Sequence, residues 1–437
     1  MLLSIEKLIY GGDGLARTAA GGDGRSMAVF VPFVLPGERV EAEIRQEKAG
    51  FARGSVAQLV EASPDRVEAR CPYFRQCGGC HYQHIAYERQ LEFKAEILRE
   101  TLQRIAKIEL KTEIRLHASP PWNYRNRARL RVETAPQFAL GYFRFGSHEF
   151  LPVRECPISS PLLNRAMARL LELGGLNCPA AVEEVELFAE AGDERLLAWA
   201  FCGREADRRD LLRWAERLER ELPKISGMTF FSSRRRFEDE GPVDLKSLAQ
   251  SGAKAIRYRA RNREYQVSAG AFFQVNRYLV DELVSVVTSD ARGDIALDLY
   301  AGVGLFSAAL APSFHHIFGV EASQTSHGDL VQNVPANVKA VGARTEDFLR
   351  SDYPRSRPAQ RPDLVVLDPP RTGAGKAVIR SLVEIRAARV RYVSCDPATL
   401  ARDLASLLAA GYHIEEAHLF DLFPGTFHIE SVMLLAR

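Results

Sequence analysis

Hydrophobic and polar residues alternate in short runs over residues 1–62, and turn-forming residues separate the runs. The runs occupy residues 4–10, 27–35, 39–48 and 54–61. Alternation with a period of two residues is typical of strands that have one buried face. The pattern predicts a small β-barrel, which could be either a nucleic-acid module or a spacer.

Residues 63–270 show a mixed pattern that predicts a central α+β domain. The segment 63–83 has few apolar residues, whereas a helix follows it with apolar side chains at a spacing of three to four. These side chains are Leu91, Ala95, Leu98, Leu102 and Ile105. Further along, residues 194–201 resemble a strand and residues 208–222 resemble a helix.

From residue 271 to 437, apolar runs alternate with helical patterns, which is typical of a doubly wound α/β sheet. The predicted strands are residues 295–300, 317–321, 364–368, 391–396, 413–420 and 431–436. Only a loop separates the last two, so we expect an antiparallel hairpin at one edge of the sheet. Residues 350–363 are the most linker-like segment.

Composition and charge limit the class of protein. Hydrophobic residues are 46% and charged residues 26% of the chain, as in an ordinary globular protein that could form two to four domains. The net charge of +2 excludes a uniformly basic surface but allows a local basic groove. No apolar run approaches the ~18 residues of a membrane span, and the first residues do not resemble a secretory signal. We therefore expect a cytoplasmic protein that acts as a monomer, without a membrane partner.

The first strand of this α/β region leads into a candidate cofactor loop. Asp298 near the strand end is followed by Gly302 and Gly304, and glycines there let a ligand approach the backbone closely. Ser307 stands where a dinucleotide fingerprint would place a third glycine. An acidic strand end suits a ligand without phosphate and with a cationic centre, such as S-adenosylmethionine. Glu321, at the end of the next strand, could accept both ribose hydroxyls, although both carboxylates could instead only cap helices.

Two later strand ends carry reactive groups. Asp368 opens D-P-P-R at 368–371, and Cys395 lies in S-C-D-P at 394–397. A cysteine in this position is often only a small buried residue, but a helix that follows it can lower the pKa of the thiol. A thiolate beside a methyl donor suits methylation at carbon 5 of uracil, with the thiolate attacking carbon 6. Glu430, just before the final strand, is the candidate base for the carbon-5 proton.

Three cysteines lie on one short loop. Cys71, Cys77 and Cys80 could hold a metal group with a fourth ligand, for which Cys156 is the best candidate. Cys178 and Cys202 are the alternatives for this fourth position. A grouping of three plus one favours iron–sulfur ligation over zinc. His81 and His84 keep a mixed zinc site open.

Arginines recur with a period of two in the strand-like segment 122–133. A strand would place all four on one face, where a phosphate backbone could bind them. These are Arg125, Arg127, Arg129 and Arg131. The alternative is that neighbouring acidic residues pair with them. A second basic stretch at 232–236 could add an RNA contact.

These ordered motifs resemble the bacterial RNA 5-methyluridine methyltransferases over nearly the whole chain. The barrel with its GGDGLA segment resembles a TRAM domain, an oligonucleotide-binding type of barrel, and the last region resembles a Rossmann-like methyltransferase sheet. The cysteines at 71, 77, 80 and 156 resemble the [4Fe-4S] ligands of that family. S-C-D-P and F-P-x-T-x-H-x-E-S resemble its nucleophile and base motifs, which implies Cys395 and Glu430.

The resemblance also implies cofactor contacts. F-x-Q-x-N at 272–276 resembles the motif whose glutamine contacts S-adenosylmethionine, which here is Gln274. The other contacts would fall on Tyr300, Glu321, Asp347 and Asp368. Ala301 and Leu305 depart from the usual cysteine and asparagine of the glycine loop, which changes fine contacts beside the cofactor. Adenine contacts cannot be assigned in the weakly patterned segment after Glu321.

Two other classes of protein compete with this interpretation. A non-catalytic iron–sulfur RNA-binding protein should have lost Cys395, Glu430 or Asp368, yet all three are present. A nicotinamide-dependent oxidoreductase should have a third glycine in the loop. Within the family, transfer-RNA members tend to lack both the barrel and the cysteine cluster. The resemblance therefore favours 23S ribosomal RNA as the substrate, with transfer RNA as the alternative.

Overall fold

A computed structural model describes residues 1–18, 26–222, 224–232, 245–353 and 360–437. The arginines at 234–236, suggested above as a second RNA contact, lie outside the described residues. The chain forms two compact units. The first comprises Met1–Thr101, Tyr142–Leu151 and Phe423–Ile429, and the second comprises Leu102–Gly141, Pro152–Leu422 and Glu430–Arg437. The three-domain division at residues 62/63 and 270/271 stays a prediction.

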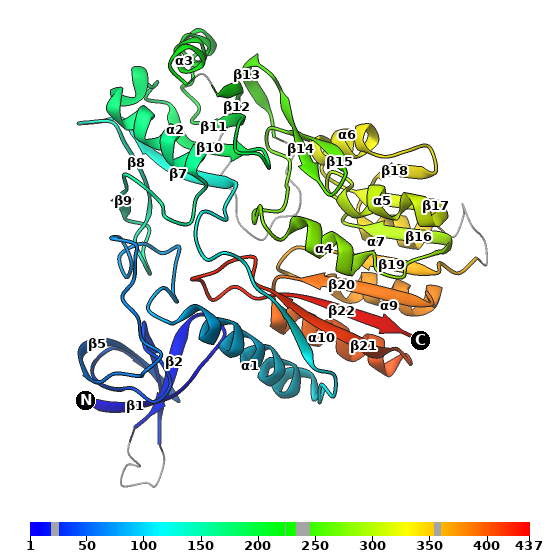
Figure 1. Ribbon diagram of the computed structural model, residues 1–437, viewed down its shortest axis with the longest axis horizontal. Coiled ribbons are helices and arrows are strands. Elements are labelled where there is room, and N and C mark those ends of the chain that lie inside the picture. Colours follow the sequence, from blue (N-terminus) through cyan, green and yellow to red (C-terminus); the bar gives the residue numbers. More distant parts are fainter. Residues whose placement is uncertain (19–25, 223, 233–244, 354–359) are drawn as a thin grey trace. The chain divides into compact units, whose positions relative to one another are not determined.

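The first unit contains the predicted barrel. Its strands are β1 (Leu2–Leu8), β2 (Asp13–Arg17), β3 (Ala28–Pro32), β4 (Arg39–Lys48) and β5 (Phe51–Glu61). They close in the order β1-β2-β3-β5-β4, drawn in blue in Figure 1. Alternate residues such as Leu3, Ile5, Val29 and Val31 fill the interior, which confirms the alternation seen in the sequence.

The predicted amphipathic helix is α1 (Tyr87–Ala106). Leu91, Leu98 and Leu102 are buried as expected, whereas Ile105 at the helix end is 44% exposed. Phe93 and Ile97 are buried instead of Ile105, so the buried stripe lies further toward the helix start than predicted.

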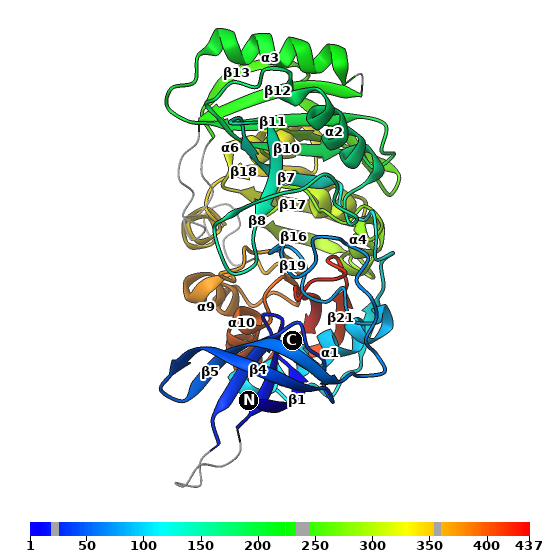
Figure 2. The ribbon, with the colours of Figure 1, turned by 90° about the vertical axis from the view of Figure 1, so that its left-hand side faces the viewer.

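A seven-stranded sheet follows in the order β13-β12-β11-β10-β7-β8-β9. Its strands are β7 (Arg127–Glu133), β8 (Ala139–Phe143), β9 (Phe150–Pro152), β10 (Val182–Ala189), β11 (Leu196–Cys202), β12 (Ile225–Ser232) and β13 (Ser247–Gly252). Helix α3 (Arg208–Glu221) packs on β12 and β13, as Figure 2 shows, and α2 (Pro161–Glu172) packs on β10. A separate hairpin pairs β14 (Ala255–Ala260) with β15 (Arg263–Ser268). The strand and helix predicted at 194–201 and 208–222 are thus β11 and α3.

The C-terminal region forms an eight-stranded sheet in the order β18-β17-β16-β19-β20-β22-β21-β6, and most of its strands are labelled in the right-hand half of Figure 1. The strands are β6 (Ile114–His117), β16 (Gly293–Leu299), β17 (Phe314–Glu321), β18 (Val338–Gly342), β19 (Leu364–Leu367), β20 (Arg389–Ser394), β21 (His413–Phe420) and β22 (Glu430–Ala436). Its central strands are buried on both faces, as parallel strands covered by helices must be. The predicted α/β fold class is confirmed.

The remaining helices connect or cover these strands. They are α4 (Val280–Val287), α5 (Leu305–Leu310), α6 (Gln324–Asn333), α7 (Thr345–Asp347), α9 (Gly375–Ile385) and α10 (Pro397–Ala409). Single turns η1 (Gly174–Leu176), η2 (Ala311–Ser313) and η3 (Phe348–Asp352) complete the described helices. Within the described residues, no helix has the length and apolar character that a membrane crossing needs.

The predicted C-terminal hairpin exists, but its position differs from the prediction. β22 inserts between β20 and β21, and β6 pairs in parallel with β21 on its outer side. The hairpin is therefore not at the edge of the sheet. The sequence does not predict β6 and β18, because both are short and each buries only one residue, so neither has a hydrophobic period.

Candidate active site

Four functional side chains come from the carboxyl ends of neighbouring parallel strands. β16 pairs in parallel with both β17 and β19, and β19 pairs in parallel with β20. Asp298 lies near the end of β16 and Glu321 at the end of β17, while Asp368 and Cys395 directly follow β19 and β20. Because parallel strands end at the same side of a sheet, these four residues share the edge at which such folds bind ligands.

The glycine loop turns sharply between β16 and α5. Gly302 and Gly304 have φ angles of 55° and 89°, and Tyr300 also has a positive φ of 65°. A Cβ on Gly304 would lie 2.7 Å from Leu330 Cδ1, so the loop needs glycine there for space as well as for conformation. The Gly302 N–H donates to Glu321 Oε2 over 2.9 Å, and this bond fixes the Glu321 carboxylate beside the loop.

Asp298 contacts helix α5, which directly follows the glycine loop. Its side chain is buried, and Ser307 Oγ donates to Asp298 Oδ2 over 2.5 Å. Asp298 Oδ1 accepts no hydrogen bond from any described residue. Burial raises the pKa of Asp298 to about 6, so the carboxyl group ionises less readily than a solvated one.

Gln274 and Asp368 are 94 positions apart in the chain and meet in the structure. Gln274 Nε2 donates to Asp368 Oδ2 over 3.4 Å, and Asn126 Nδ2 in turn holds the Gln274 carbonyl oxygen over 3.0 Å. Burial raises the pKa of Asp368 to about 7, and the nearby Asp298 adds to this effect. The glutamine motif and the D-P-P-R motif therefore belong to one site.

Cys395 and Glu430 face each other across two antiparallel strands. Ser394 of β20 pairs with Ser431 of β22, so the next opposing pair is Cys395 and Glu430. Burial raises the pKa of Glu430 well above its ordinary value, and Asp368 raises it further. Arg371 has the opposite effect on the pKa of Glu430 because it favours the charged carboxylate.

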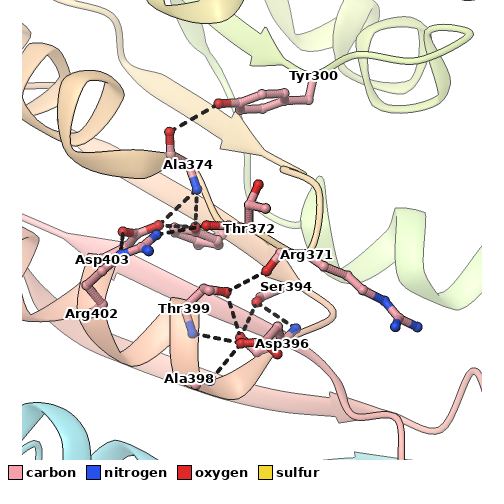
Figure 3. Close-up of polar contacts among 11 residues, drawn as sticks. Tyr300, Arg371, Thr372, Ala374, Ser394, Asp396, Ala398, Thr399, Arg402 and Asp403 are labelled. Atoms are coloured by element: carbon pink, nitrogen blue, oxygen red, sulfur yellow. Dashed lines mark hydrogen bonds and ion pairs between the residues drawn. The ribbon is translucent and has the colours of Figure 1, made fainter. Parts of the chain in front are cut away.

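The pKa of the Cys395 thiol is raised, not lowered as the helix that follows it led us to expect. Asp396 caps α10 by accepting the N–H groups of Ala398 and Thr399, at 3.0 and 2.8 Å, so its carboxylate already uses these donors (Figure 3). Burial, together with the charges of Glu430 and Asp368, raises the pKa of Cys395 to about 12, and Arg371 opposes this rise.

Two other predicted cofactor residues have different surroundings. Tyr300 donates its hydroxyl hydrogen to the Ala374 carbonyl oxygen over 3.4 Å, which connects the glycine loop to the segment after Asp368 (Figure 3). Asp347, at the end of α7, forms an ion pair with Arg350 at 2.9 Å, and its side chain is 50% exposed. This partner lies in η3, the turn that follows, and not among the other predicted cofactor residues.

The predicted metal ligands show no metal site in the described part of the chain. Cys71, Cys77 and Cys80 belong to the first unit and Cys156 to the second. Among the described residues, no three histidine, cysteine or acidic side chains are arranged to hold a metal ion. The predicted iron–sulfur cluster and the zinc alternative therefore find no support in the geometry.

The histidines and the two remaining cysteines of that prediction are largely buried. Burial lowers the pKa of His81 to about 4 and that of His84 to about 3, which keeps both rings neutral. Burial raises the pKa of Cys202 to about 12 and also raises that of Cys178. Cys178 and Cys202 therefore remain neutral thiols within the second unit.

The structure pairs three of the four predicted RNA-binding arginines with carboxylates of β10. Arg129 and Arg131 both contact Glu184, and Arg127 lies 3.7 Å from Glu186. Arg127 is also buried, with its guanidinium over the rings of Phe188 and Trp199.

Arg125 precedes β7, and its Nε donates to the Arg127 carbonyl oxygen over 3.3 Å. The geometry of the segment favours the alternative of local ion pairs. A role of the four arginines in RNA binding stays a prediction.

Two comparisons with known sequences describe this architecture. The sequence model of the tRNA (uracil-5-)-methyltransferase family matches residues 252–437, and that of the TRAM domain matches residues 1–57. An uncharacterised RNA methyltransferase of Halalkalibacterium halodurans is 32% identical over 458 residues, with 99% of this chain and 96% of the relative covered. The 23S rRNA (uracil(1939)-C(5))-methyltransferase RlmD of Halomonas elongata is 34% identical and covers 99% of this chain and 89% of the relative.

The chain belongs to the RNA (uracil-5-)-methyltransferase family.

A solved structure extends the likeness to the whole fold. The Pyrococcus abyssi tRNA (uracil-54, C5)-methyltransferase in complex with S-adenosyl-L-homocysteine matches with a TM-score of 0.73 and 26% identity, covering 100% of both chains. The protein is therefore an enzyme that methylates carbon 5 of uracil in RNA and uses S-adenosylmethionine as the methyl donor. Its barrel is a TRAM domain.

Some residues of this site have no role that the sequence alone reveals. Arg371 stands in the D-P-P-R motif, and its charge acts on both Cys395 and Glu430. Asn276, the last residue of the glutamine motif, is buried and donates to Ser119 Oγ over 2.9 Å. The sequence indicates Arg371 only through its place in the D-P-P-R motif. Nothing in the sequence reveals that Asn276 contacts Ser119.

Proposed function

We propose that Cys395 is the nucleophile of methyl transfer and forms a transient bond to carbon 6 of the uracil. The supporting observation is that the ladder of β20 and β22 ends at the pair Ser394–Ser431, so that Cys395 and Glu430 are the next residue on each strand. Attack by the thiolate moves the C5=C6 electron pair toward the carbonyl at carbon 4, and carbon 5 becomes nucleophilic. Bound S-adenosylmethionine supplies an electrophilic methyl group to carbon 5 and leaves as S-adenosylhomocysteine.

Glu430 acts as the base in the second half of the reaction. Its carboxylate removes the proton from carbon 5, the C5=C6 double bond forms again, and the bond between carbon 6 and the sulfur breaks. Burial raises the pKa of Cys395 to about 12 and that of Glu430 well above its ordinary value. Arg371 opposes this rise and favours the ionised form of both groups.

Substitution at each residue tests the two roles separately. Cys395→Ala should abolish transfer of tritiated methyl groups to RNA, because the bond to carbon 6 can no longer form. Glu430→Gln should still form the bond but resolve it slowly, so a covalent RNA–protein complex should accumulate on denaturing gels. Methylation by Cys395→Ala at a rate within about tenfold of the natural protein would exclude the mechanism.

We propose that S-adenosylmethionine lies over the glycine loop. The backbone at Gly302 and Gly304 allows close approach, and the carboxylate of Glu321 is held beside the loop. Asp368 follows β19, the strand that pairs with β16 on its other side. Gln274 reaches the same place through its hydrogen bond to Asp368. Tyr300 and Asp347 complete the contact set, and Asp298 contributes through the loop that it supports.

We propose 23S ribosomal RNA as the substrate. In support, RlmD of Halomonas elongata, 34% identical, carries uracil 1939 of 23S rRNA in its name. Transfer RNA is the second candidate, because the Pyrococcus abyssi enzyme that matches the entire chain is named for uracil 54 of tRNA. The barrel alone does not separate the two candidates, since this likeness covers all of both chains. Methylation of unmodified transcripts of both RNAs, with the product nucleotide mapped, distinguishes them.

We further propose that Cys71, Cys77, Cys80 and Cys156 bind a [4Fe-4S] cluster, with zinc as the alternative. The proposal rests on the sequence, in which three thiols on one short loop suit either metal. No reaction step described above depends on the cluster. Iron, zinc and sulfide contents of anaerobically purified protein, compared with those of Cys77→Ser, test the proposal. Active protein that holds none of them contradicts it.

A further inference from the structure

The loop 368–374, which carries both Asp368 and Arg371, is fixed by the first turns of helix α10. Thr399 Oγ1 donates to the Arg371 carbonyl oxygen over 3.2 Å, and Arg402 Nη2 donates to the Thr372 carbonyl oxygen over 3.0 Å. The Ala374 N–H donates to Asp403 Oδ2 over 2.9 Å (Figure 3). Three successive contacts thus bind the loop backbone to one face of a single helix.

Asp403 is the centre of this arrangement. Its side chain is buried at 2% exposure, and the Tyr392 hydroxyl donates to the same Oδ2 over 2.8 Å. Arg402 Nε donates to the other oxygen, Oδ1, over 2.9 Å. Asp403 therefore holds β20, α10 and the loop at one point.

The loop lies so close to Asp403 that a side chain is excluded between them. Gly373 has a φ of +77°, and a Cβ there would lie 2.8 Å from Asp403 Oδ2 and 2.6 Å from Arg402 Nη2. The position is therefore restricted both by backbone conformation and by space. Such a close fit allows the loop little freedom to shift along the helix.

Helix α10 also fixes the nucleophile. Cys395 directly precedes the cap residue Asp396, which holds the N–H groups of Ala398 and Thr399. Thr399 thus belongs to the turn that holds the cap and also contacts the loop that carries Arg371. The distance between Cys395 and Arg371 is set through this one helix.

We propose that Asp403 is a positioning residue for methyl transfer, which holds the Ala374 backbone so that Arg371 stays in register with Cys395 and Glu430. The inference rests on the proposed roles of Cys395 and Glu430. Asp403 acts through the loop, because it accepts the Ala374 N–H. When the loop is released, the Arg371 cation moves away from the thiol and the carboxyl group, and both ionise less readily.

The test measures how fast iodoacetamide alkylates Cys395 in the full-length protein at a series of pH values, with peptide mass spectrometry to separate this thiol from the other six. Asp403→Ala should shift the alkylation midpoint to higher pH and lower kcat by about tenfold to a hundredfold. The affinity for S-adenosylmethionine should fall by a smaller factor than kcat, because Asp368 stands in the released loop but the bond between Gly302 and Glu321 is untouched. Asp403→Asn, which keeps an acceptor oxygen for Ala374, should recover part of the loss.

Two further variants separate positioning from a general loss of stability. Asp363→Ala also removes a carboxylate that accepts two backbone N–H groups, those of Asp294 and Ile295, but at the opposite end of the strands. It should lower the unfolding temperature without moving the alkylation midpoint. If Asp403→Ala does not fold, Tyr392→Phe removes a single hydroxyl from the same point and should show a smaller shift in the same direction.

A double variant that combines Asp403→Ala with Arg371→Ala tests whether Asp403 acts through Arg371. If Asp403 acts through Arg371, the double variant should be no slower than Arg371→Ala alone, since the two losses are not additive. Additive losses, or an alkylation midpoint of Asp403→Ala equal to that of the natural protein, would overturn the proposal. Loss of activity in Cys395→Ala, measured in parallel, keeps the outcome for Asp403 distinct from that for the proposed function.

Discussion

Three acidic groups are crowded at one end of the C-terminal sheet. Burial raises the pKa of Cys395 to about 12 and that of Asp368 to about 7, and it also raises that of Glu430. Each group makes the ionisation of the others less favourable. The carboxyl groups and the thiol therefore ionise less readily than solvated ones, and Arg371 opposes this effect at Cys395 and Glu430.

This crowding should reduce stability in a way that depends on pH. The pKa of Asp368 is near its ordinary value of 3.8 in the unfolded chain but about 7 in the folded protein, so the folded state retains its proton longer. Its contribution to stability is therefore fully present below pH 3.8 and is lost as the pH rises through 7. Asp368→Asn should accordingly stabilise the protein more at pH 8 than at pH 5, by roughly 1–2 kcal/mol for this partly exposed group.

Urea unfolding of the natural protein and Asp368→Asn at both pH values measures this difference. Asp363→Asn is the matched control. The Asp363 carboxylate accepts backbone hydrogen bonds at the other end of the strands, so this variant should destabilise the protein at both pH values. An equal gain for Asp368→Asn at pH 5 and pH 8 would show that its carboxyl group ionises normally in the folded protein.

At the residue scale, the sequence predicts which groups carry the chemistry but not their state. Cys395, Glu430 and Asp368 stand in recognisable motifs, so their identity can be inferred. The pKa of Cys395 cannot, because it depends on burial and on Glu430, a residue brought opposite by strand pairing. The period of the arginines at 125–131 likewise contains no information on Glu184, which lies on a different strand.

Two glycines show how a single position can decide the stability of an element. Gly227 of β12 pairs with Gly252 of β13, and a Cβ on Gly227 would overlap the Ala253 carbonyl oxygen. This neighbour is backbone and cannot rotate away. Gly227→Ala should therefore separate the two strands locally and lower the free energy of unfolding by about 2–4 kcal/mol.

Gly328→Ala is the control for this prediction. Gly328 lies within α6 and is exposed, and a Cβ added there would meet no described atom within 4 Å. Alanine should favour the helix there and raise the free energy of unfolding by about 1 kcal/mol. Urea unfolding of both variants, with S-adenosylmethionine binding as a check on the fold, measures the two effects. A neutral Gly227→Ala would mean that β12 and β13 do not approach so closely.

At the element scale, long periodic segments were predictable and short ones were not. The strands at 295–300 and 364–368 are apolar except for Asp298 and Asp368, which fits buried parallel strands. β6 has only four residues, and its place beside β21 depends on a pairing with residues 417–420, far along the chain. Hydrophobic periodicity indicates which element a residue belongs to. It does not indicate which strand, about 300 positions along the chain, that element pairs with.

At the scale of the whole molecule, one strand from far upstream in the chain completes the C-terminal sheet. β6 covers the outer side of β21 by pairing Ile114–His117 with residues 417–420, and His117 Nε2 lies 2.9 Å from His418 Nδ1. Residues 252–437, the part that matches the methyltransferase family model, lack this strand. Removing β6 would leave β21 as an open edge with unpaired backbone groups.

A fragment of residues 252–437 should therefore associate through the exposed edge and bind S-adenosylmethionine more weakly than the full chain. Light scattering after size-exclusion chromatography, together with binding calorimetry, measures both properties. A fragment that begins at residue 107 and retains β6 is the comparison, and it should associate less. A monomeric 252–437 fragment with the affinity of the full chain would contradict this account.

The central claim is that Cys395 bonds to carbon 6 of a uracil in RNA. RNA that carries 5-fluorouridine tests it directly, because fluorine at carbon 5 cannot be removed as a proton and the bond to the thiol persists. The enzyme should form a stable complex with such RNA in the presence of S-adenosylmethionine, and mass spectrometry should locate the crosslink on the peptide that contains Cys395. A crosslink on another residue, or a complex that forms equally well with Cys395→Ala, would contradict the account.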